Sequence, residues 1–474
     1  KPLHYAKAGG TFLFASEIKS ILAYGLPRHA NLDVLEIYLT LGYVPAPFSF
    51  VKDVHKLPPG HYAIVRAGRI RLQRYWDMPE LDEANMLTSR EEVFEQFQSL
   101  FYDSIRIRMR SDVSYGAFLS GGLDSSSVVA VMSKISGRPV ETFTSGFNEK
   151  DFDERSLAQD VADRSKTNHH EHTVTPDSFD ENIRRILYHF DEPFGDSSAI
   201  PTGYVSMYAR ESVKMVLTGD GGDEALSGYN AYQSEKFASQ YQRLPGVCRA
   251  IPTRLSNSAA RLVGGGKMAR LVRILWTSGL TLNERLLTKA AWAEIDLVRR
   301  LLRPLSASVI PVDDYLKDFM NSCAYKDDFY RLMYYHFKLT LPDDMLTKVD
   351  RMSMAYSLEA RVPFLDYRLV EFMMRVHKDV KMQGYERKSV LRRTVGRSLP
   401  RSILKAPKRG FVVPLREWFK DKSRTAALLE LIAQGPLDSS GGVTDEILTK
   451  SASGHADHGN FIWMLFLLGT WLNA

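Results

Sequence analysis

The chain has 474 residues, with 62 Lys or Arg against 56 Asp or Glu and a formal net charge of +6. Its 44% hydrophobic and 25% charged residues are ordinary for a globular protein, and its length favours two or three domains over a single core. Two cysteines exclude a disulfide framework, and the longest apolar stretch, 461–472, is too short to cross a bilayer. We expect a cytoplasmic enzyme.

The first eighty residues indicate short strands with little core of their own. Strands are predicted at 11–15, at 62–66 after the turn at 57–61, and in a further segment ending at Trp76. So few residues of strand and short helix cannot easily close a sandwich core unaided. We therefore expect that the first half of this domain is absent from the chain.

A linker is predicted at 79–90, and from residue 91 to the C-terminus the pattern alternates strand and helix. A helix is expected at 91–108, further helices from residue 153, at 183–189 and at 201–211, and strands at 113–119, 140–147, 172–174 and 213–217. Such alternation predicts an α/β fold with a parallel sheet, right-handed crossovers and ligands at the carboxyl ends of its strands.

The first glycine-rich loop, at 120–127, reads S-G-G-L-D-S-S-S between two apolar runs. Adjacent glycines let backbone N–H groups turn inward, and the following helix start adds unpaired N–H groups. This predicts a pyrophosphate cradle formed by Ser120, Gly121, Gly122, Ser125 and Ser126, with Asp124 placed to hold Mg²⁺. No Lys follows the glycines as in a P-loop, and no G-x-G-x-x-G indicates a dinucleotide site.

The second glycine-rich loop, at 218–224, reads T-G-D-G-G-D-E and follows the strand predicted at 213–217. Its three acids would repel one another and a phosphate unless a divalent cation bridged them. We therefore predict that Asp223 and Asp124, at two strand ends, share one magnesium–pyrophosphate unit. The alternative for this loop alone is an acidic turn stabilised by a helix dipole.

Three further segments and the two cysteines contain residue types that often serve in active sites or metal sites. The loop at 191–198 is rich in acids and hydroxyls, and the segment 341–366 predicts a helix that continues until the extended residues from Arg361. Alternating orientation on an extended chain disfavours zinc at the histidine-rich segment 169–172. Cys248 and Cys323 are interpreted as small buried hydrophobes.

The two loops resemble those of the N-type ATP pyrophosphatases, and T-G-D-G-G-D-E resembles a signature of the asparagine synthetases. Residues 1–5, 14–20 and 57–61 are similar to the end of a class II glutamine amidotransferase domain, which precedes the ATP domain in the glutamine-hydrolysing asparagine synthetase family. The resemblance implies an adenine nucleotide α-hydrolase-like domain at 91–474, with a helical C-terminal part. It implies that residues 1–78 are the remnant of an Ntn-type α+β amidotransferase domain.

The resemblance also implies an activity: an ATP-dependent, amide-forming ligase that adenylates a carboxylate, first of all the aspartate side chain, releases pyrophosphate and admits ammonia. It implies ATP and Mg²⁺ as cofactors and small molecules as partners, without nucleic acid or a membrane span, and it leaves a homodimer open. Asp220 and Lys388 would be catalytic. Phe118, Leu119 and Ser145 would line the adenine side, Thr218 and Gly219 would lie near the ribose and α-phosphate, and Asp196, Ser197 and Glu224 would face the substrate.

The amidotransferase domains of this family use an N-terminal Cys nucleophile, whereas residue 1 here is Lys. The chain as given is therefore not expected to hydrolyse glutamine. Three alternatives remain open: a relative acting on a uronate, peptide or β-amino acid, a silent nucleotide- or partner-binding module, and a tRNA-modifying pyrophosphatase. The intact set of Asp124, Asp223 and Lys388 argues against the silent module. A nucleic-acid enzyme would need aromatic residues among its basic ones and salt-sensitive affinity.

Overall fold

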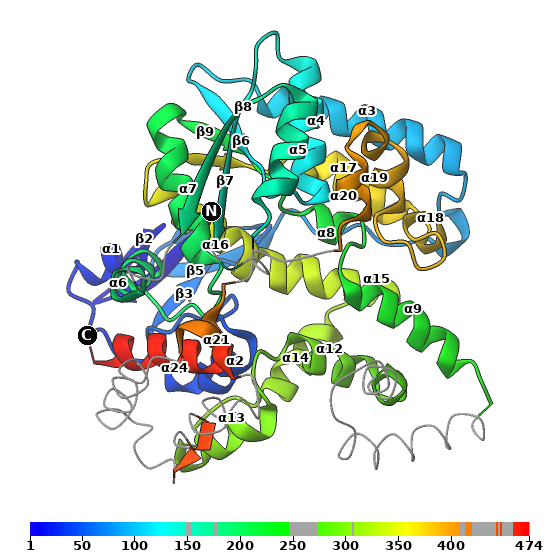
Figure 1. Ribbon diagram of the computed structural model, residues 1–474. Helices are drawn as coiled ribbons and strands as arrows, with labels where there is room; N and C mark the ends of the chain where they lie inside the picture. The colour runs from blue at the N-terminus through cyan, green and yellow to red at the C-terminus, as the bar shows by residue number, and fades with distance from the viewer. Residues whose placement is uncertain are drawn as a thin grey trace.

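The computed structural model describes residues 1–147, 149, 153–174, 179–245, 274–305, 308–407, 413–419, 442–443, 446–447 and 458–473. Two parts are visible in Figure 1: an N-terminal segment of short strands and helices, and a larger part built around a sheet. The two parts share one buried hydrophobic cluster, so the N-terminal segment is packed against the rest.

The N-terminal segment (residues 1–76) contains a three-stranded antiparallel sheet and a hairpin. The sheet has the order β2 (Thr11–Ala15), β1 (His4–Ala8), β3 (Val54–Lys56), and the hairpin pairs β4 (His61–Arg66) with β5 (Arg69–Arg74). Helices α1 (Ile18–Leu22) and α2 (Leu35–Leu41) lie between β2 and β3 along the chain. All seven residues of α2 are buried, and the Tyr38 hydroxyl donates a hydrogen bond to the Met464 carbonyl at 3.0 Å. A helix buried on every side belongs to the interior of the protein.

Five parallel strands form the central sheet, in the order β10-β9-β6-β7-β8. Their bounds are β6 (Tyr115–Phe118), β7 (Glu141–Phe147), β8 (Asn168–Val174), β9 (Met215–Leu217) and β10 (Glu359–Arg361). The first strand along the chain, β6, is central: β7 and β8 extend to one side of it, and β9 and β10 to the other. The order therefore reverses between β6 and β9, and ligands bind at such a switch point in open parallel sheets.

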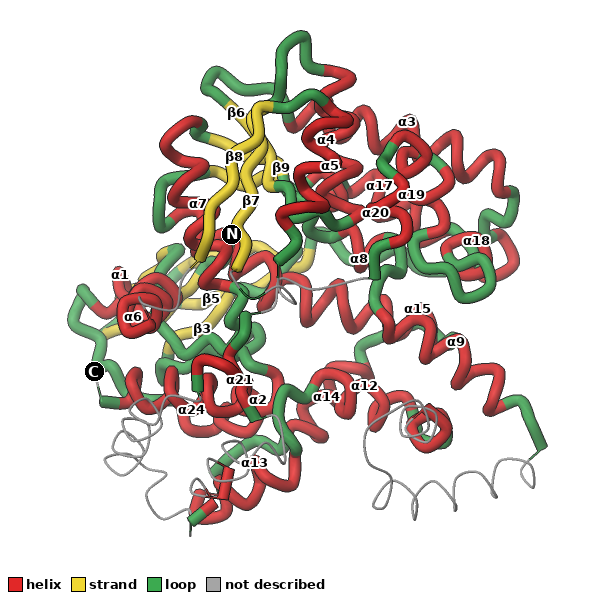
Figure 2. The backbone as a smooth tube through the Cα atoms, in the orientation of Figure 1, coloured by secondary structure: helices red, strands yellow, loops and turns green. Residues whose placement is uncertain are grey.

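Helices cover both faces of the sheet, as Figure 2 shows. Helices α4 (Leu123–Ile135) and α5 (Arg155–Ser165) lie on one face, and α7 (Ala199–Ser212) lies on the other, where it contacts β7 and α16 (Thr347–Met354). The helix α3 (Arg90–Arg108) packs on α4 and begins at Ser89, whose hydroxyl accepts a hydrogen bond from the Glu92 N–H. This doubly covered parallel sheet confirms the predicted α/β class.

The segment 341–366 differs from its prediction in two ways. The helix begins earlier, because α15 (Asp328–Tyr335) runs directly into a π-helical segment, His336–Leu346, that contains Pro342. Proline lacks the N–H of a regular turn, and the wider turn tolerates this loss. The helix then ends at Met354, and Glu359–Arg361 pairs with β9 as an edge strand. A three-residue strand of this composition has no periodic sequence signal. Its extended conformation is therefore set by pairing with β9.

The rest of the described chain is mainly helical. Helices α9 (Asn230–Gln242), α12 (Leu282–Ala290) and α14 (Val312–Asn321) lie below the sheet in Figure 1, and α24 (Gly459–Leu472) packs on α2. Eleven residues of α24, which contains the apolar stretch 461–472, are buried. Among the residues that the structure describes, none of the helices combines the length and apolar character that a membrane crossing requires.

Candidate active site

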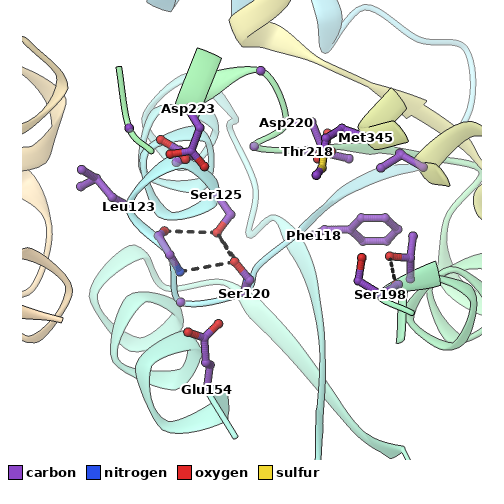
Figure 3. A pocket seen from close by; sticks show the side chains of 18 of the residues that line it. Phe118, Ser120, Leu123, Ser125, Glu154, Ser198, Thr218, Asp220, Asp223 and Met345 are labelled. Atoms are coloured by element: carbon purple, nitrogen blue, oxygen red, sulfur yellow. Dashed lines mark hydrogen bonds between the residues drawn. The ribbon is translucent and has the colours of Figure 1, made fainter. Parts of the chain in front are cut away.

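A pocket of about 700 Å³ opens at the switch point between β6 and β9. Figure 3 shows side chains of both glycine-rich loops around it. The pocket gathers nearly all of the site residues expected from the sequence: Phe118, Leu119, Ser120, Gly121, Gly122, Asp124, Ser125, Ser145, Asp196, Ser197, Thr218, Gly219, Asp220, Asp223, Glu224 and Lys388. Ser126 is the exception, because it is completely buried inside α4 and does not line the pocket.

The first loop is held in a tight turn by its own hydroxyls. Ser125 Oγ accepts a hydrogen bond from the Ser120 N–H at 3.2 Å and donates one to the Gly122 carbonyl at 3.2 Å. Gly121 has a φ of +73°, and a Cβ there would stand 2.7 Å from Leu157 Cβ, so a larger residue does not fit. The turn ends at the N-terminus of the 13-residue helix α4, whose unpaired N–H groups favour an anion.

The second loop packs directly against the first. A Cβ on Gly222 would stand 2.6 Å from Asp124 Cγ, which explains the glycine at this position. The carboxylates of Asp124 and Asp223 both contact the Lys388 ammonium, with Asp223 Oδ1 at 2.5 Å. Burial opposes a charge there, but the two carboxylates raise the pKa of Lys388, and the ammonium stays protonated. Carboxylates from both loops thus meet around one cation.

One end of the pocket is apolar and follows β6 and β7. Phe118 and Ser145 line it, together with Phe143 and Val205. Ser145 Oγ is buried and has no hydrogen-bond partner among the described residues, and a buried hydroxyl of that kind is available to a ligand. An apolar wall with a few hydroxyls suits a planar heterocycle such as adenine.

Another part of the pocket wall is charged and well shielded from water. Lys348 Nζ lies 2.6 Å from Asp196 Oδ2, and each side chain is only 9% exposed. Asp196 Oδ1 accepts hydrogen bonds from the Ser198 N–H at 2.9 Å and from its hydroxyl at 2.7 Å. Burial disfavours the Asp196 carboxylate, but Lys348 holds the pKa of Asp196 below its usual value. Burial and the nearby Asp196 together raise the pKa of Asp344 well above its usual range.

The remaining acids of the second loop are Asp220 and Glu224. Burial raises the pKa of Asp220, which faces the pocket. Glu224 Oε1 accepts a hydrogen bond from the Tyr229 hydroxyl at 2.5 Å, and burial, with Glu224 beside it, raises the pKa of Tyr229 well above its usual value. A raised pKa on a carboxyl that lines a pocket is a feature that acid–base groups share.

Sequence reasoning missed several residues that line the pocket, chiefly Lys348, Tyr229, Arg387 and Glu154. Lys348 lies within the segment 341–366 that the sequence singled out, in the first turn of α16, which directly follows the π-helical segment. Arg387 directly precedes Lys388, and its guanidinium donates a hydrogen bond to the Gly228 carbonyl at 3.1 Å. Its position next to Lys388 was the one sequence signal that pointed to Arg387.

The histidine-rich segment lies in β8 and is engaged in contacts within the protein. His169 Nδ1 is 3.0 Å from the Thr142 hydroxyl, His170 Nε2 is 2.7 Å from Glu141 Oε2, and His172 packs on the Tyr208 ring. Among the described residues, no three or more His, Cys, Asp or Glu side chains are grouped to hold a metal ion. Cys323 is partly buried, and Cys248 lies outside the described residues.

Comparison with known protein families decides between the superfamily members. The model of the asparagine synthase family matches residues 96–473, which include both loops, Lys348 and Lys388. The chain belongs to the asparagine synthase family. The model of a glutamine amidotransferase domain matches residues 1–76, the N-terminal segment. An asparagine synthase-type domain preceded by a short amidotransferase-like segment is the fold expected from the sequence.

Individual relatives agree with the asparagine synthase assignment. "Asparagine synthetase (glutamine-hydrolyzing) 1" of Bacillus subtilis is 27% identical over 475 residues, covering 99% of this chain and 73% of the relative. "Putative asparagine synthetase (glutamine-hydrolyzing) 2" of Methanocaldococcus jannaschii is 38% identical over 261 residues, covering 54% of this chain and 50% of the relative. "Amidase chry2" of Gibberella zeae is 24% identical, covering 88% of this chain and 66% of the relative. The protein is an enzyme of the asparagine synthase type with an ATP-dependent ligase function.

Proposed function

We propose that the enzyme adenylates a carboxylate, first of all the side chain of aspartate, and then amidates it with ammonia. A carboxylate oxygen forms a bond to the α-phosphorus of ATP, and the bond from that phosphorus to the β-phosphate bridging oxygen breaks. Ammonia then forms the C–N bond, the acyl C–O bond breaks with AMP leaving, and the surplus proton passes to a base. The products are the amide, AMP and pyrophosphate.

The observation that carries this proposal is the contact between the two loops at the switch point. The first loop offers backbone N–H groups at a helix start, and the second loop brings Asp223 to the same cation as Asp124. Ser120, Ser125 and the α4 N-terminus would hold the departing pyrophosphate. Because an acyl-adenylate is itself reactive, positioning and charge neutralisation would provide most of the rate enhancement.

Magnesium fits the residues at this point. Asp124 and Asp223 present hard carboxylate oxygens that already converge on a cationic group, and Mg²⁺ prefers such oxygens together with substrate phosphates. When bound, the ion would neutralise charge on the phosphates of ATP. Lys388 would provide a second positive charge near the α-phosphate. Asp220 would act as the base that accepts the proton from ammonia.

Asp196, Ser197 and Glu224 are proposed to contact the carboxylate substrate, which we call the acceptor. All three line the pocket. A second candidate function, amidation of a different carboxylate, shares every ATP-binding residue with the first. It is favoured by one observation, the likeness over 88% of the chain to a relative named an amidase.

Pyrophosphate release tests both candidates. The full chain is incubated with MgATP and ammonium across a panel of carboxylates: aspartate, glutamate, succinate, β-amino acids and galacturonate. We expect acceptor-dependent release with aspartate and loss of that release in Asp124→Ala. Release with another panel member but not with aspartate would favour the second candidate. Survival of full activity in Asp124→Ala would overturn the assigned role of this residue.

A further inference from the structure

The loop Asp191–Ser198, which we call the acceptor loop, is anchored outside the pocket by the N-terminal segment. The Gly195 N–H donates a hydrogen bond to the Gly42 carbonyl at 2.6 Å. Asp191 Oδ2 accepts one from the Ile18 N–H at 2.7 Å. In these two hydrogen bonds the N-terminal partner is a backbone group of a segment that the amidotransferase model matches, whereas the acceptor loop belongs to the asparagine synthase domain.

A further anchor is a shielded ion pair. Lys56 Nζ lies 2.5 Å from Glu192 Oε1 and donates a hydrogen bond to the Val44 carbonyl at 2.5 Å. Glu192 Oε2 accepts a further hydrogen bond from the Phe50 N–H at 2.8 Å. The side chains of Lys56 and Glu192 are 10% and 9% exposed. Charge-assisted hydrogen bonds in a shielded environment fix geometry well, because water does not compete for either partner.

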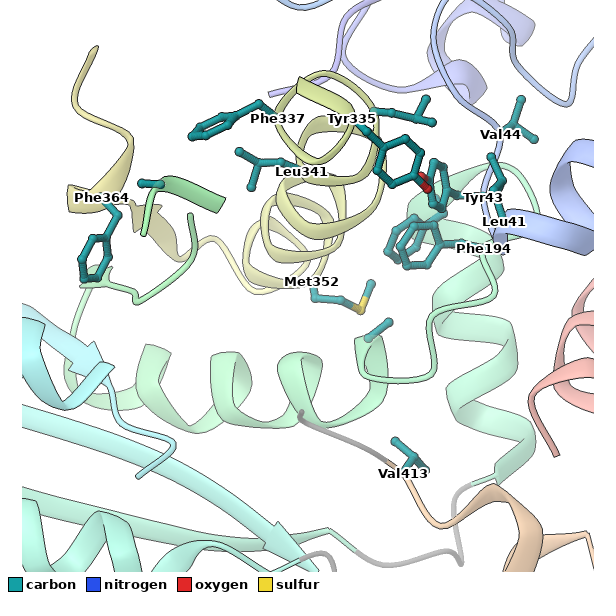
Figure 4. Packing of buried hydrophobic residues seen from close by; sticks show 14 of the residues in the cluster. Leu41, Tyr43, Val44, Phe194, Tyr335, Phe337, Leu341, Met352, Phe364 and Val413 are labelled. Carbon is teal, nitrogen blue, oxygen red and sulfur yellow. The ribbon is translucent and has the colours of Figure 1, made fainter. Parts of the chain in front are cut away.

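The rest of the acceptor loop has little freedom to adjust. Phe194 is buried in the same cluster as Leu41 and Tyr43 of the N-terminal segment, as Figure 4 shows. A Cβ on Gly195 would stand 2.6 Å from Met464 Cγ, so the loop is also confined by α24. Three residues connect Glu192 to Asp196, and two of them, Phe194 and Gly195, cannot shift without disturbing packed neighbours.

We propose that Lys56 is a positioning residue for the acceptor. It holds Glu192, and through it the loop that places Asp196 and Ser197 in the pocket, so the N-terminal segment forms part of the acceptor site even when free ammonia is the nitrogen source. The inference rests on the proposed function for the identity of the acceptor contacts. It assigns no role to Lys56 in ATP binding, since the cradle at 120–125 is formed by other elements.

The test compares the effect of a Lys56 substitution on the KM for the acceptor with its effect on the KM for ATP. Lys56→Met in the full chain, assayed by pyrophosphate release with saturating ammonium, is expected to raise KM for the acceptor at least tenfold and to change KM for ATP less than twofold. Lys56→Arg should recover most of the loss, because it keeps the charge. Lys52→Met is the matched control, since Lys52 is an exposed lysine four residues earlier. Unchanged constants, or an equal rise in both, would overturn the proposal.

Two further measurements keep the test decisive. Lys56→Met leaves Glu192 buried without its charge partner and can unfold the chain, so the double variant Lys56→Met/Glu192→Gln removes both charges together. In wild type and double variant, amide hydrogen exchange is followed in peptides covering 191–198 and 118–126. We expect exchange at least tenfold faster in the first peptide and unchanged exchange in the second. Equal protection in both proteins would refute the positioning role, and this readout holds even if no acceptor supports pyrophosphate release.

Discussion

Lys388 has an unusual backbone for a long side chain, with a φ of +54° at the position that precedes α19 (Ser389–Arg393). A non-glycine residue in this region costs on the order of 1–3 kcal/mol and persists where surrounding contacts determine it. The contacts here are the two carboxylates of Asp124 and Asp223. The strain is therefore concentrated at the residue that we propose to act on the phosphates.

Replacement of Lys388 by Met should affect the chemical step. We expect the kcat for pyrophosphate release to fall by about 10²- to 10³-fold, the usual effect of removing one preorganised electrostatic group. Arg393→Met, on an exposed face of the same helix, serves as control and should retain activity. Steady-state kinetics with MgATP, ammonium and aspartate provides the measurement. A loss below threefold would contradict the role.

Lys381 is a buried lysine that the proposed mechanism does not use. Its ammonium lies 3.3 Å from the Met333 sulfur and 5.5 Å from the centre of the Tyr330 ring. Burial lowers the pKa of Lys381 to about 7. The folded protein therefore binds fewer protons than the unfolded chain between pH 7 and the usual lysine range, and the stability of the fold should rise as pH increases through that window.

Lys381→Met should remove this dependence. We expect the variant to be more stable than wild type at pH 7, by up to about 4 kcal/mol, because the unfolded chain no longer gains a proton. The advantage should shrink toward pH 10. Thermal melting at several pH values checks this, with the exposed Lys317→Met as control. A variant that melts below wild type at pH 7 would show that the ammonium contacts stabilise the fold.

At the scale of elements, the two loops depend on their close approach. Gly222→Ala would push a Cβ against Asp124, and we expect at least a tenfold loss of pyrophosphate release with little change in melting temperature. Gly137→Ala is the matched control, since nothing lies within 4 Å of its Cβ position and its φ is not positive. If Gly222→Ala kept wild-type activity, contact between the loops would not matter for the reaction.

The same scale explains what the sequence predicted. Both loops follow apolar runs and carry glycines with chemically specific neighbours, so the parallel sheet and the residues at its strand ends could be predicted. The edge strand Glu359–Arg361 could not, because its pairing with β9 is a long-range event without local periodicity. The helix begins before residue 341, where it was predicted to start, since a π-helical turn accommodates Pro342 within it. The inward orientation of Lys348 and Tyr229 depends on packing that no local pattern encodes. The predicted domain boundaries and the individual roles of the site residues stay predictions.

At the scale of the whole molecule, the boundary between the N-terminal segment and the sheet domain buries titratable groups. Asp343 lies there, near Lys56, and burial raises its pKa to about 6. The folded protein binds more protons than the unfolded chain between the usual Asp value and pH 6. The stabilising contribution of the protonated carboxyl is thus complete below about pH 4 and lost as pH rises through about 6.

Asp343→Asn should remove the contribution of this residue to the pH dependence of stability. Relative to wild type, the variant is expected to gain up to about 3 kcal/mol of stability as pH rises from 4 to 7. Melting temperatures at pH 4.5 and 7.5 measure the effect, and Asp314→Asn on the exposed surface of α14 is the control. A difference between wild type and variant that stays constant with pH would contradict the raised pKa.

The switch-point sheet also has a consequence for biosynthesis. The strand β6 pairs with β9, whose residues emerge from the ribosome much later, and Lys388 emerges later still. A nascent chain therefore has no nucleotide-binding site until most of its length has been made and its central strands have met. Since ATP would bind only the finished topology, the cellular nucleotide pool would favour that topology by mass action over every earlier arrangement.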